Sequence, residues 1–234
     1  MRKLYRREMN CQIVHDSYHE RGFTDSYAIT IDGKVVGYGS IAGPVGRRSL
    51  LKEFFVYPEW RNEAVSLLRN LIEVSGATTV ETQTNDPLLA VLFWDVATNV
   101  TSDTILFADA QTTNLDSPGA EFRRIRTRER SKVFAHTVEP IGDWGLEREG
   151  HIVATGGVMY HYNAPYGDIY MEVAERHRRV GLGSYLVQEL KRIAYEGGHT
   201  PAARCNRDNT PSRRALERAG MLPCGRILTG RIVT

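Results

Sequence analysis

Residues 167–186 read GDIYMEVAERHRRVGLGSYL, and the change of pattern within this stretch indicates the fold. The first part has the alternation and aromatic content of a strand, and an amphipathic helical run begins at about Leu182. Backbone N–H groups at a helix start have no intrahelical partner and carry the positive end of the helix dipole. Gly181 and Gly183 remove the Cβ atoms that would keep a phosphate away from those amides. With Arg178 and Arg179 beside them, they predict a cradle for a pyrophosphate.

A Gly-x-Gly pair is also common in plain strand-to-helix turns flanked by solvated arginines, so the motif needs context. Two other phosphate motifs do not fit this chain. The dinucleotide fingerprint requires a third glycine where this sequence has Leu186, and GxxxxGK[ST] does not occur.

The composition limits the class of protein. The chain has 234 residues, a formal charge of +2 and a hydrophobic share of 41%, enough for two packed domains. The small net charge gives no reason to expect a nucleic-acid partner. The sequence contains no signal-peptide pattern and no long apolar run, so we expect a cytoplasmic protein without a membrane partner. The three cysteines form no metal motif, and His15 and His19 lack a third ligand, so we expect no metal site.

The sequence contains an internal repeat. ITIDGKVVGYGS (29–40) and LEREGHIVATGG (146–157) each predict a hairpin, with the turn glycines Gly33 and Gly150 lying 117 residues apart. The same separation relates Arg61, in FFVYPEWRNEA (54–64), to Arg178.

Each half then continues with a helix, a strand, a second helix and a last strand, DTILFAD (103–109) or GRILTGRI (225–232). We therefore predict an α/β protein with mixed sheets (α+β), made of two tandem domains. The linker composition of residues 109–121 places the domains at 1–115 and 116–234.

Two motifs in the second half together resemble a known family. Met171-Glu172-Val173 leads into Arg178-Arg-Val-Gly181-Leu-Gly183, and a later strand is followed by Asn209, Ser212 and Gly220-Met221. This order and spacing, over about residues 121–230, are similar to the GNAT family of N-acetyltransferases. The resemblance implies a tandem acyl-CoA N-acyltransferase-like fold and acetyl transfer from acetyl-CoA to an amine. It implies that the strand pairs with the pantetheine arm, that the turn holds the pyrophosphate, and that Asn209 and Ser212 lie near the thioester. The implied acetyl-CoA-binding residues are Met171, Val173, Arg178, Arg179, Val180, Gly181, Leu182, Gly183, Ser184, Asn209 and Ser212.

The catalytic groups are harder to transfer from the family. Many members carry a tyrosine acid seven residues after the asparagine, where this chain has Leu216, and some protein-acetylating members carry a glutamate where this chain has Arg204. The nearby candidates are Asp168, Tyr170 and Glu172, which share one face of the strand by period-two alternation. A turn or edge carboxylate is the alternative interpretation for Asp168.

The first half departs from the cofactor motif. Ala64 and Ser66 stand where the second half has Gly181 and Gly183, and Glu63 adds negative charge there. We therefore expect the first half not to bind coenzyme A but to wall the acceptor cleft or form a homodimer surface. Its polar stretch at residues 81–86 could bind a ligand, although a turn with a helix cap is the favoured interpretation.

These observations favour an N-acetyltransferase that moves an acetyl group from acetyl-CoA to an amine, a small molecule more readily than a protein. The alternative is a non-catalytic acyl-CoA-binding sensor or scaffold, suggested by the missing tyrosine and the altered first half.

Overall fold

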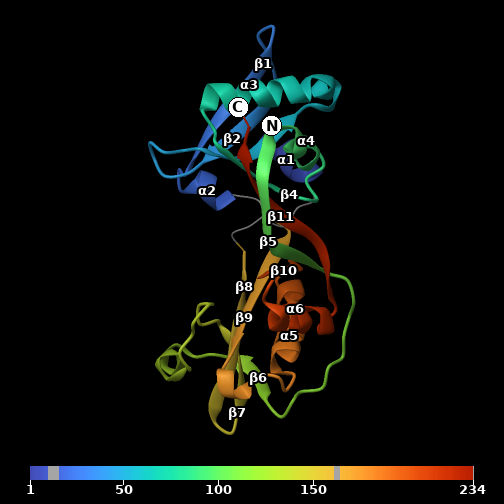
Figure 1. Ribbon diagram of the computed structural model, residues 1–234. Helices are drawn as coiled ribbons and strands as arrows, with labels where there is room; N and C mark the ends of the chain where they lie inside the picture. Colours follow the sequence, from blue (N-terminus) through green and yellow to red (C-terminus); the bar gives the residue numbers. More distant parts are fainter. Residues whose placement is uncertain (10–15, 161–163, 234) are drawn as a thin grey trace. The chain divides into compact units, whose positions relative to one another are not determined.

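The computed structural model describes residues 1–9, 16–160 and 164–233, and these form two compact units (Figure 1). The first unit comprises Met1–Thr104 and Gly225–Thr234, and the second comprises Ile105–Cys224. Strands β5 (Ala97–Asp109) and β11 (Met221–Ile232) contribute residues to both units. As predicted, both units are mixed α/β structures with mixed sheets.

The first unit has a sheet in the order β1-β2-β3-β4-β11-β5. Its β3–β4 pair is parallel, while the β1–β2, β2–β3 and β4–β11 pairs are antiparallel. The remaining elements are α1 (Arg2–Glu8), α2 (Asp16–Glu20), β1 (Thr24–Ile31), β2 (Lys34–Ala42), β3 (Leu50–Val56), the 3-10 helix η1 (Pro58–Glu63), α3 (Ala64–Ser75), β4 (Thr79–Gln83) and α4 (Leu89–Val96).

The second unit has a sheet in the order β5-β10-β9-β8-β7-β6. Its β9–β10 pair is parallel, and the β6–β7, β7–β8 and β8–β9 pairs are antiparallel. The remaining elements are β6 (Glu121–Arg124), η2 (Thr127–Lys132), β7 (Trp144–Arg148), β8 (His151–Met159), β9 (Tyr166–Val173), η3 (Glu175–His177), α5 (Leu182–Glu196), β10 (Thr200–Asn206) and α6 (Thr210–Arg218).

The two hairpins predicted as a repeat share even their irregularities. Both turn residues have positive φ, 49° and 75° at residues 32–33 and 52° and 78° at residues 149–150. This backbone matches the natural twist of two-residue hairpins. Each ladder also shifts register at the same place, between residues 29 and 30 and between residues 146 and 147. The 117-residue separation is therefore a structural repeat as well as a sequence one.

Local signals placed the helix ends correctly. Helix α3 stops at Gly76, which has a left-handed φ of 66°, and α5 begins at Leu182 and is followed by Gly198 at φ 76°. The Asp86 side chain accepts the N–H groups at the start of α4, and Asn209 caps α6. Glycine tolerates the left-handed region and short polar side chains satisfy orphan amides, so these residues mark boundaries.

The domain ends differ from the predicted division at 1–115 and 116–234. Residues 105–109 belong to the second unit, and residues 225–234 belong to the first. The last part of the chain pairs antiparallel with β4, with Ile227 opposite Gln83 and Arg231 opposite Thr79. The closing strand of each half thus contributes residues to the other unit. A strand of suitable pattern can pair with any open sheet edge, because the pattern does not specify its neighbour.

Each unit has its own core. In the first, the apolar faces of α3 and α4 pack with sheet residues such as Phe54 and Leu228. In the second, Leu182, Leu186 and Leu190 of α5 pack with Phe107 of β5 and other sheet residues. Burial of these large side chains from water is the main stabilising term for both units.

Candidate functional site

Strand β9 separates two environments. Ile169 lies in the second core, and Met171 and Val173 pack against it, whereas Asp168, Tyr170 and Glu172 alternate with them along the strand. In Figure 1, α5 and α6 lie to one side of β8 and β9, and the segment between η2 and β7 lies to the other. The predicted alternation is confirmed, so the three candidate catalytic residues share the side that this segment covers.

The turn after β9 leaves its amides exposed to a ligand. Arg179 has a φ of 66° and Gly181 a φ of 89°, so the chain breaks sharply between η3 and α5. Within the part of the chain that the structure describes, no N–H group from 179 to 184 donates a backbone or side-chain hydrogen bond. A Cβ on Gly181 would meet no atom within 4 Å. Such a set of unpaired N–H groups at a helix start can accept an anion.

The side chains of the predicted cofactor set differ in their surroundings. Leu182 is fully buried and Ser184 is buried, so these two can offer only main-chain groups, while Val180 is half exposed. A Cβ on Gly183 would lie 3.4 Å from Met171 Cε and 3.5 Å from Ala215 Cβ. Gly183 therefore keeps the space between β9 and α6 open.

Arg178 has a structural bond of its own. Its Nε donates to the Val173 carbonyl oxygen at 3.0 Å. In the first unit, Arg61 Nε donates to the Val56 carbonyl oxygen at 3.1 Å. The arginine thus braces the strand end in both units, and in the second unit its terminal nitrogens can still reach a phosphate.

The first unit lacks the open turn. Ala64, the counterpart of Gly181, has a helical φ of −58°, and its N–H donates to the Arg61 carbonyl oxygen. The 3-10 helix η1 therefore runs directly into α3, with the acidic Glu63 at the junction. This geometry offers no cradle comparable to the one at 179–184.

Asn209 and Ser212, predicted near the thioester, are engaged with each other. Asn209 Oδ1 accepts the Ser212 N–H at 3.1 Å and so caps α6. Leu216, at the position of the family's tyrosine, is buried in the second core. The structure therefore gives the Asn209 side chain a capping role at this helix.

Glu172 is saturated with hydrogen bonds. Its carboxylate accepts the Thr137 N–H and hydroxyl, each at 3.0 Å, the Val138 N–H at 3.1 Å and the Glu139 N–H at 3.0 Å. Burial alone would raise the pKa of Glu172, but the three N–H groups lower it to about 2. A carboxylate this well stabilised is a poor proton acceptor, so Glu172, one of the three candidate catalytic residues, does not suit the role of base.

Asp168 has the opposite character. It is buried on β9, its Oδ2 lies 3.3 Å from Arg204 Nε, and its Oδ1 has no hydrogen-bond partner among the described residues. Burial raises the pKa of Asp168, Arg204 lowers it and Glu139 raises it, and the resulting value is about 7. Such a carboxyl can take up a proton at neutral pH. Arg204, at the position where some family members carry a glutamate, is here the ion-pair partner of the Asp168 carboxylate.

Tyr170 lies between these two carboxylates on the strand. It is half buried, and a Cβ on Gly157 would come within 2.7 Å of its hydroxyl oxygen. Burial raises the pKa of Tyr170; Asp143 raises it further and Arg130 opposes this. The hydroxyl therefore stays protonated and can donate a proton or a hydrogen bond.

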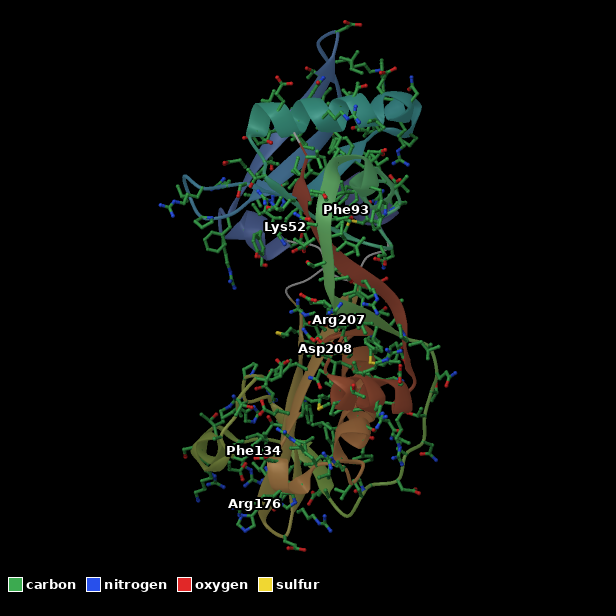
Figure 2. All side chains as sticks on the ribbon, in the orientation of Figure 1. Lys52, Phe93, Phe134, Arg176, Arg207 and Asp208 are labelled. Atoms are coloured by element: carbon green, nitrogen blue, oxygen red, sulfur yellow. The ribbon has the colours of Figure 1, made fainter. Side chains whose placement is uncertain are left out.

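Sequence reasoning missed the residues that face β9 from the segment between η2 and β7. The His136 ring bonds the Glu139 carbonyl oxygen at 2.8 Å and Thr155 Oγ1 at 3.1 Å, and it stacks on Phe134, which Figure 2 labels. One signal could have pointed to it, because His19 lies 117 residues earlier. That ring also contacts a sheet carboxylate, Glu53, at 3.1 Å.

Two profiles of one family match the chain. The "Acetyltransferase (GNAT) domain" profile matches residues 1–110, and the "Acetyltransferase (GNAT) family" profile matches residues 110–221. The chain belongs to the GNAT acetyltransferase family. It carries two GNAT domains in tandem, and family membership supports acyl transfer as its general activity.

Solved structures share the GNAT fold at low sequence identity. An acetyltransferase of the GNAT family from Colwellia psychrerythraea is 15% identical, with a TM-score of 0.76 over 99% of this chain and 95% of that one. A GCN5-related N-acetyltransferase from Sphaerobacter thermophilus is 18% identical, with a TM-score of 0.54 over 88% and 80%. A tandem GNAT protein from the clavulanic acid biosynthesis pathway is 14% identical, with a TM-score of 0.53 over 89% and 82%. No curated protein matches the sequence.

The remaining sequence expectations concern other parts of the GNAT chain. His15 lies outside the described residues. In residues 1–9, 16–160 and 164–233 there is no cluster of three or more typical metal-ligating side chains, and no helix has the length and apolarity to cross a membrane. In the polar stretch at 81–86, Asp86 caps α4 and Glu81 pairs with Lys52 at 2.6 Å, so the helix-cap interpretation holds there (Figure 2 labels Lys52).

Proposed function

We propose that this chain is an N-acetyltransferase that moves an acetyl group from acetyl-CoA to the amine of a small molecule, with its working site in the second unit. The observation that carries the proposal is the buried oxygen of Asp168, which has no hydrogen-bond partner in the part of the chain that the structure describes, on the strand that leads into the open amides at 179–184. One group can receive the proton of an amine, and the other can hold the diphosphate of the donor.

The donor would be held mainly by backbone. The amides at 179–184 and the positive end of α5 attract the diphosphate, and Arg178 and Arg179 add charge. The main chain of Met171 and Val173 pairs with β8 on one side, but the parallel pairing with β10 on the other side extends only to Ile169, so this side can pair with the pantetheine amides. Asn209 and Ser212 would shape the surface near the thioester through the cap they form rather than through a free amide side chain.

Deprotonation of the acceptor is the main chemical demand. Deprotonation of an alkyl ammonium with a pKa of ~10.4 costs about 4–5 kcal/mol at neutral pH. Asp168 Oδ1 accepts this proton, and the nitrogen lone pair then attacks the thioester carbonyl carbon. The C–S bond breaks as the tetrahedral intermediate collapses, and the thiolate of coenzyme A leaves. The Tyr170 hydroxyl can donate a proton to that thiolate, which fills the role of the missing family tyrosine.

The first unit would not bind a second coenzyme. The Ala64 N–H is bonded within the turn and Glu63 adds negative charge, which supports one donor site per chain. Isothermal titration with acetyl-CoA measures this stoichiometry directly. A second site of similar affinity would contradict this assignment.

The test of the enzyme assignment is thiol release from acetyl-CoA over a panel of small primary amines. We expect release above background with the wild-type chain and loss with Asp168→Asn, while acetyl-CoA still binds both. Acetyl-CoA binding with no thiol release for any amine would instead support a sensor or scaffold, a role compatible with Leu216 lying in the core and Asn209 being used as a cap.

A further inference from the structure

The segment at 133–143 is tied down over one face of the second sheet by Glu172. Three consecutive N–H groups, from residues 137 to 139, and the Thr137 hydroxyl converge on this carboxylate at 3.0–3.1 Å. The segment has two further attachments to β8, through Gly142 N–H and His136, both to Thr155 Oγ1. A charge-assisted set of this size holds a loop in one conformation.

The hydrogen bonds from residues 137–139 to the Glu172 carboxylate, called here the clamp, determine where Glu139 lies. Because the Glu139 N–H is one of the bonded groups, its Cα is fixed beside β9, while its own carboxylate has no hydrogen bond or ion pair among the described residues. Burial raises the pKa of Glu139, Arg204 lowers it, Glu172 raises it and His136 lowers it. The charge of Glu139 in turn raises the pKa of Asp168, so the two carboxylates are close enough to interact.

The charges on this face do not balance. Asp143 pairs with Arg130, and Glu172 accepts three N–H groups and a hydroxyl, with His136 Nδ1 3.5 Å from its Oε2. That leaves Asp168 and Glu139 with one guanidinium, that of Arg204, and the His136 ring as the basic groups that act on them among the described residues. The second, independent sign of an unfilled site is Asp168 Oδ1, which is buried and lacks a hydrogen-bond partner within residues 1–9, 16–160 and 164–233. Buried polar atoms without a partner are rare, and a donor from a ligand would satisfy this one.

We propose that Glu139 and Asp168 form a site for the ammonium form of the acceptor, and that Glu172 positions Glu139 through the backbone of residues 137–139. The inference rests on the proposed function and adds the acceptor class: amines that are cationic at neutral pH. The ammonium donates hydrogen bonds to both carboxylates, and one proton then passes to Asp168 Oδ1 and leaves the neutral amine. Glu139 takes no proton in this step and is available to the next ammonium.

The experiment uses two amines of similar size that differ in charge. Cyclohexylamine is an ammonium ion at neutral pH, and aniline is neutral. Each is titrated calorimetrically into the full-length protein saturated with coenzyme A, so turnover is not required. We expect cyclohexylammonium to bind the wild type more tightly than aniline does, because only the cation meets the charge of Glu139.

Two substitutions separate recognition from positioning. Glu139→Gln leaves the backbone N–H of the clamp intact, and we expect it to weaken cyclohexylammonium binding at least about tenfold without changing aniline binding. Glu172→Gln places an amide N–H₂ against three N–H donors. We expect it to weaken cyclohexylammonium binding and to speed hydrogen exchange of the 137–139 amides, with acetyl-CoA affinity unchanged. Glu121→Gln, at an exposed position on β6, is the matched control.

The outcomes distinguish this inference from the proposed function. Equal binding of the two amines to the wild type, or unchanged cyclohexylammonium binding in Glu139→Gln, overturns the ammonium site even when acetyl-CoA binds normally. Failure of the wild type to bind acetyl-CoA overturns the proposed function itself. If Glu139→Gln proves unstable, Glu139→Asp keeps the charge. Binding of cyclohexylammonium by this variant no tighter than that of aniline would likewise contradict the inference.

Discussion

Arg178 Nε donates to the carbonyl oxygen of Val173, five residues earlier, at 3.0 Å. The first unit contains the same bond between Arg61 and Val56, at 3.1 Å. The shared arginine is thus part of the turn's architecture in both units. What distinguishes the units is the residue three positions later, which is Gly181 at φ 89° in one and Ala64 at φ −58° in the other.

The first prediction concerns these glycines. Gly181→Ala forces a Cβ into the left-handed region and should cost about 1–2 kcal/mol of stability as well as acetyl-CoA affinity. Gly183→Ala has room at 3.4–3.5 Å from Met171 and Ala215, so its stability should stay within about 1 kcal/mol of wild type. We expect its acetyl-CoA affinity to fall because the methyl group narrows the space between β9 and α6. Denaturation and calorimetric titration measure the two effects separately, and an affinity for Gly183→Ala equal to wild type would count against the cradle.

The second prediction concerns Asp168 and pH. A base works only when ionised, and the pKa of Asp168 is raised to about 7, so the rate of acetyl transfer should rise as pH increases through about 7 and then level off. Asp168→Asn should lower kcat by about 10²–10⁴-fold with little change in acetyl-CoA affinity. Measurement of the rate of thiol release as a function of pH tests this prediction. Retention of the same profile in Asp168→Asn would assign the proton transfer to another group.

The third prediction concerns acid stability of the first unit. Glu53 is fully buried and accepts hydrogen bonds from Arg2, Tyr38 and His19. Burial raises its pKa, but His19 and Arg2 lower it, to about 2 in the folded protein from an ordinary 4.5. Because the folded value is the lower one, the stabilisation is present above about pH 4.5 and is lost as pH falls toward 2.

This linkage makes Glu53→Gln diagnostic. We expect the substitution to lower the free energy of unfolding by about 3 kcal/mol at pH 7, with the difference from wild type shrinking steadily below pH 4.5. Urea denaturation at pH 7, 4 and 3 measures it. The exposed Glu63 gives a control in Glu63→Gln, which should differ little from wild type at any of these pH values.

The fourth prediction concerns the exchanged strands. Ile105 and Phe107 are buried in the second core, yet both precede the predicted domain start at residue 116. A fragment of residues 116–234 loses both side chains, at a cost of about 5–10 kcal/mol, which is comparable to the whole stability of a small domain. We expect it to be unfolded or aggregated by circular dichroism, while a fragment of residues 105–224 keeps native-like content. A well-folded 116–234 fragment would contradict the division into units.

The candidate site shows where sequence reasoning succeeds. Alternation along β9 correctly placed Asp168, Tyr170 and Glu172 on one face and Met171 and Val173 on the other. It did not rank the three, because the ranking depends on donors supplied by residues 137–139, far away in sequence. Glu172 is surrounded by N–H groups and Asp168 is buried with a single cation, so two similar carboxylates acquire pKa values of about 2 and about 7.

By itself, the sequence determined what depends on short-range hydrogen bonding and backbone sterics. These features are the repeat of 117 residues, the hairpin turns at 32–33 and 149–150, and the helix boundaries at Gly76, Leu182 and Asn209. Only the tertiary structure decided which unit each closing strand joins and which carboxylate keeps one buried oxygen without a hydrogen-bond donor among the described residues. A strand's pattern specifies a buried face but not its neighbour, and a carboxylate's pKa depends on the burial and partners that folding brings to it.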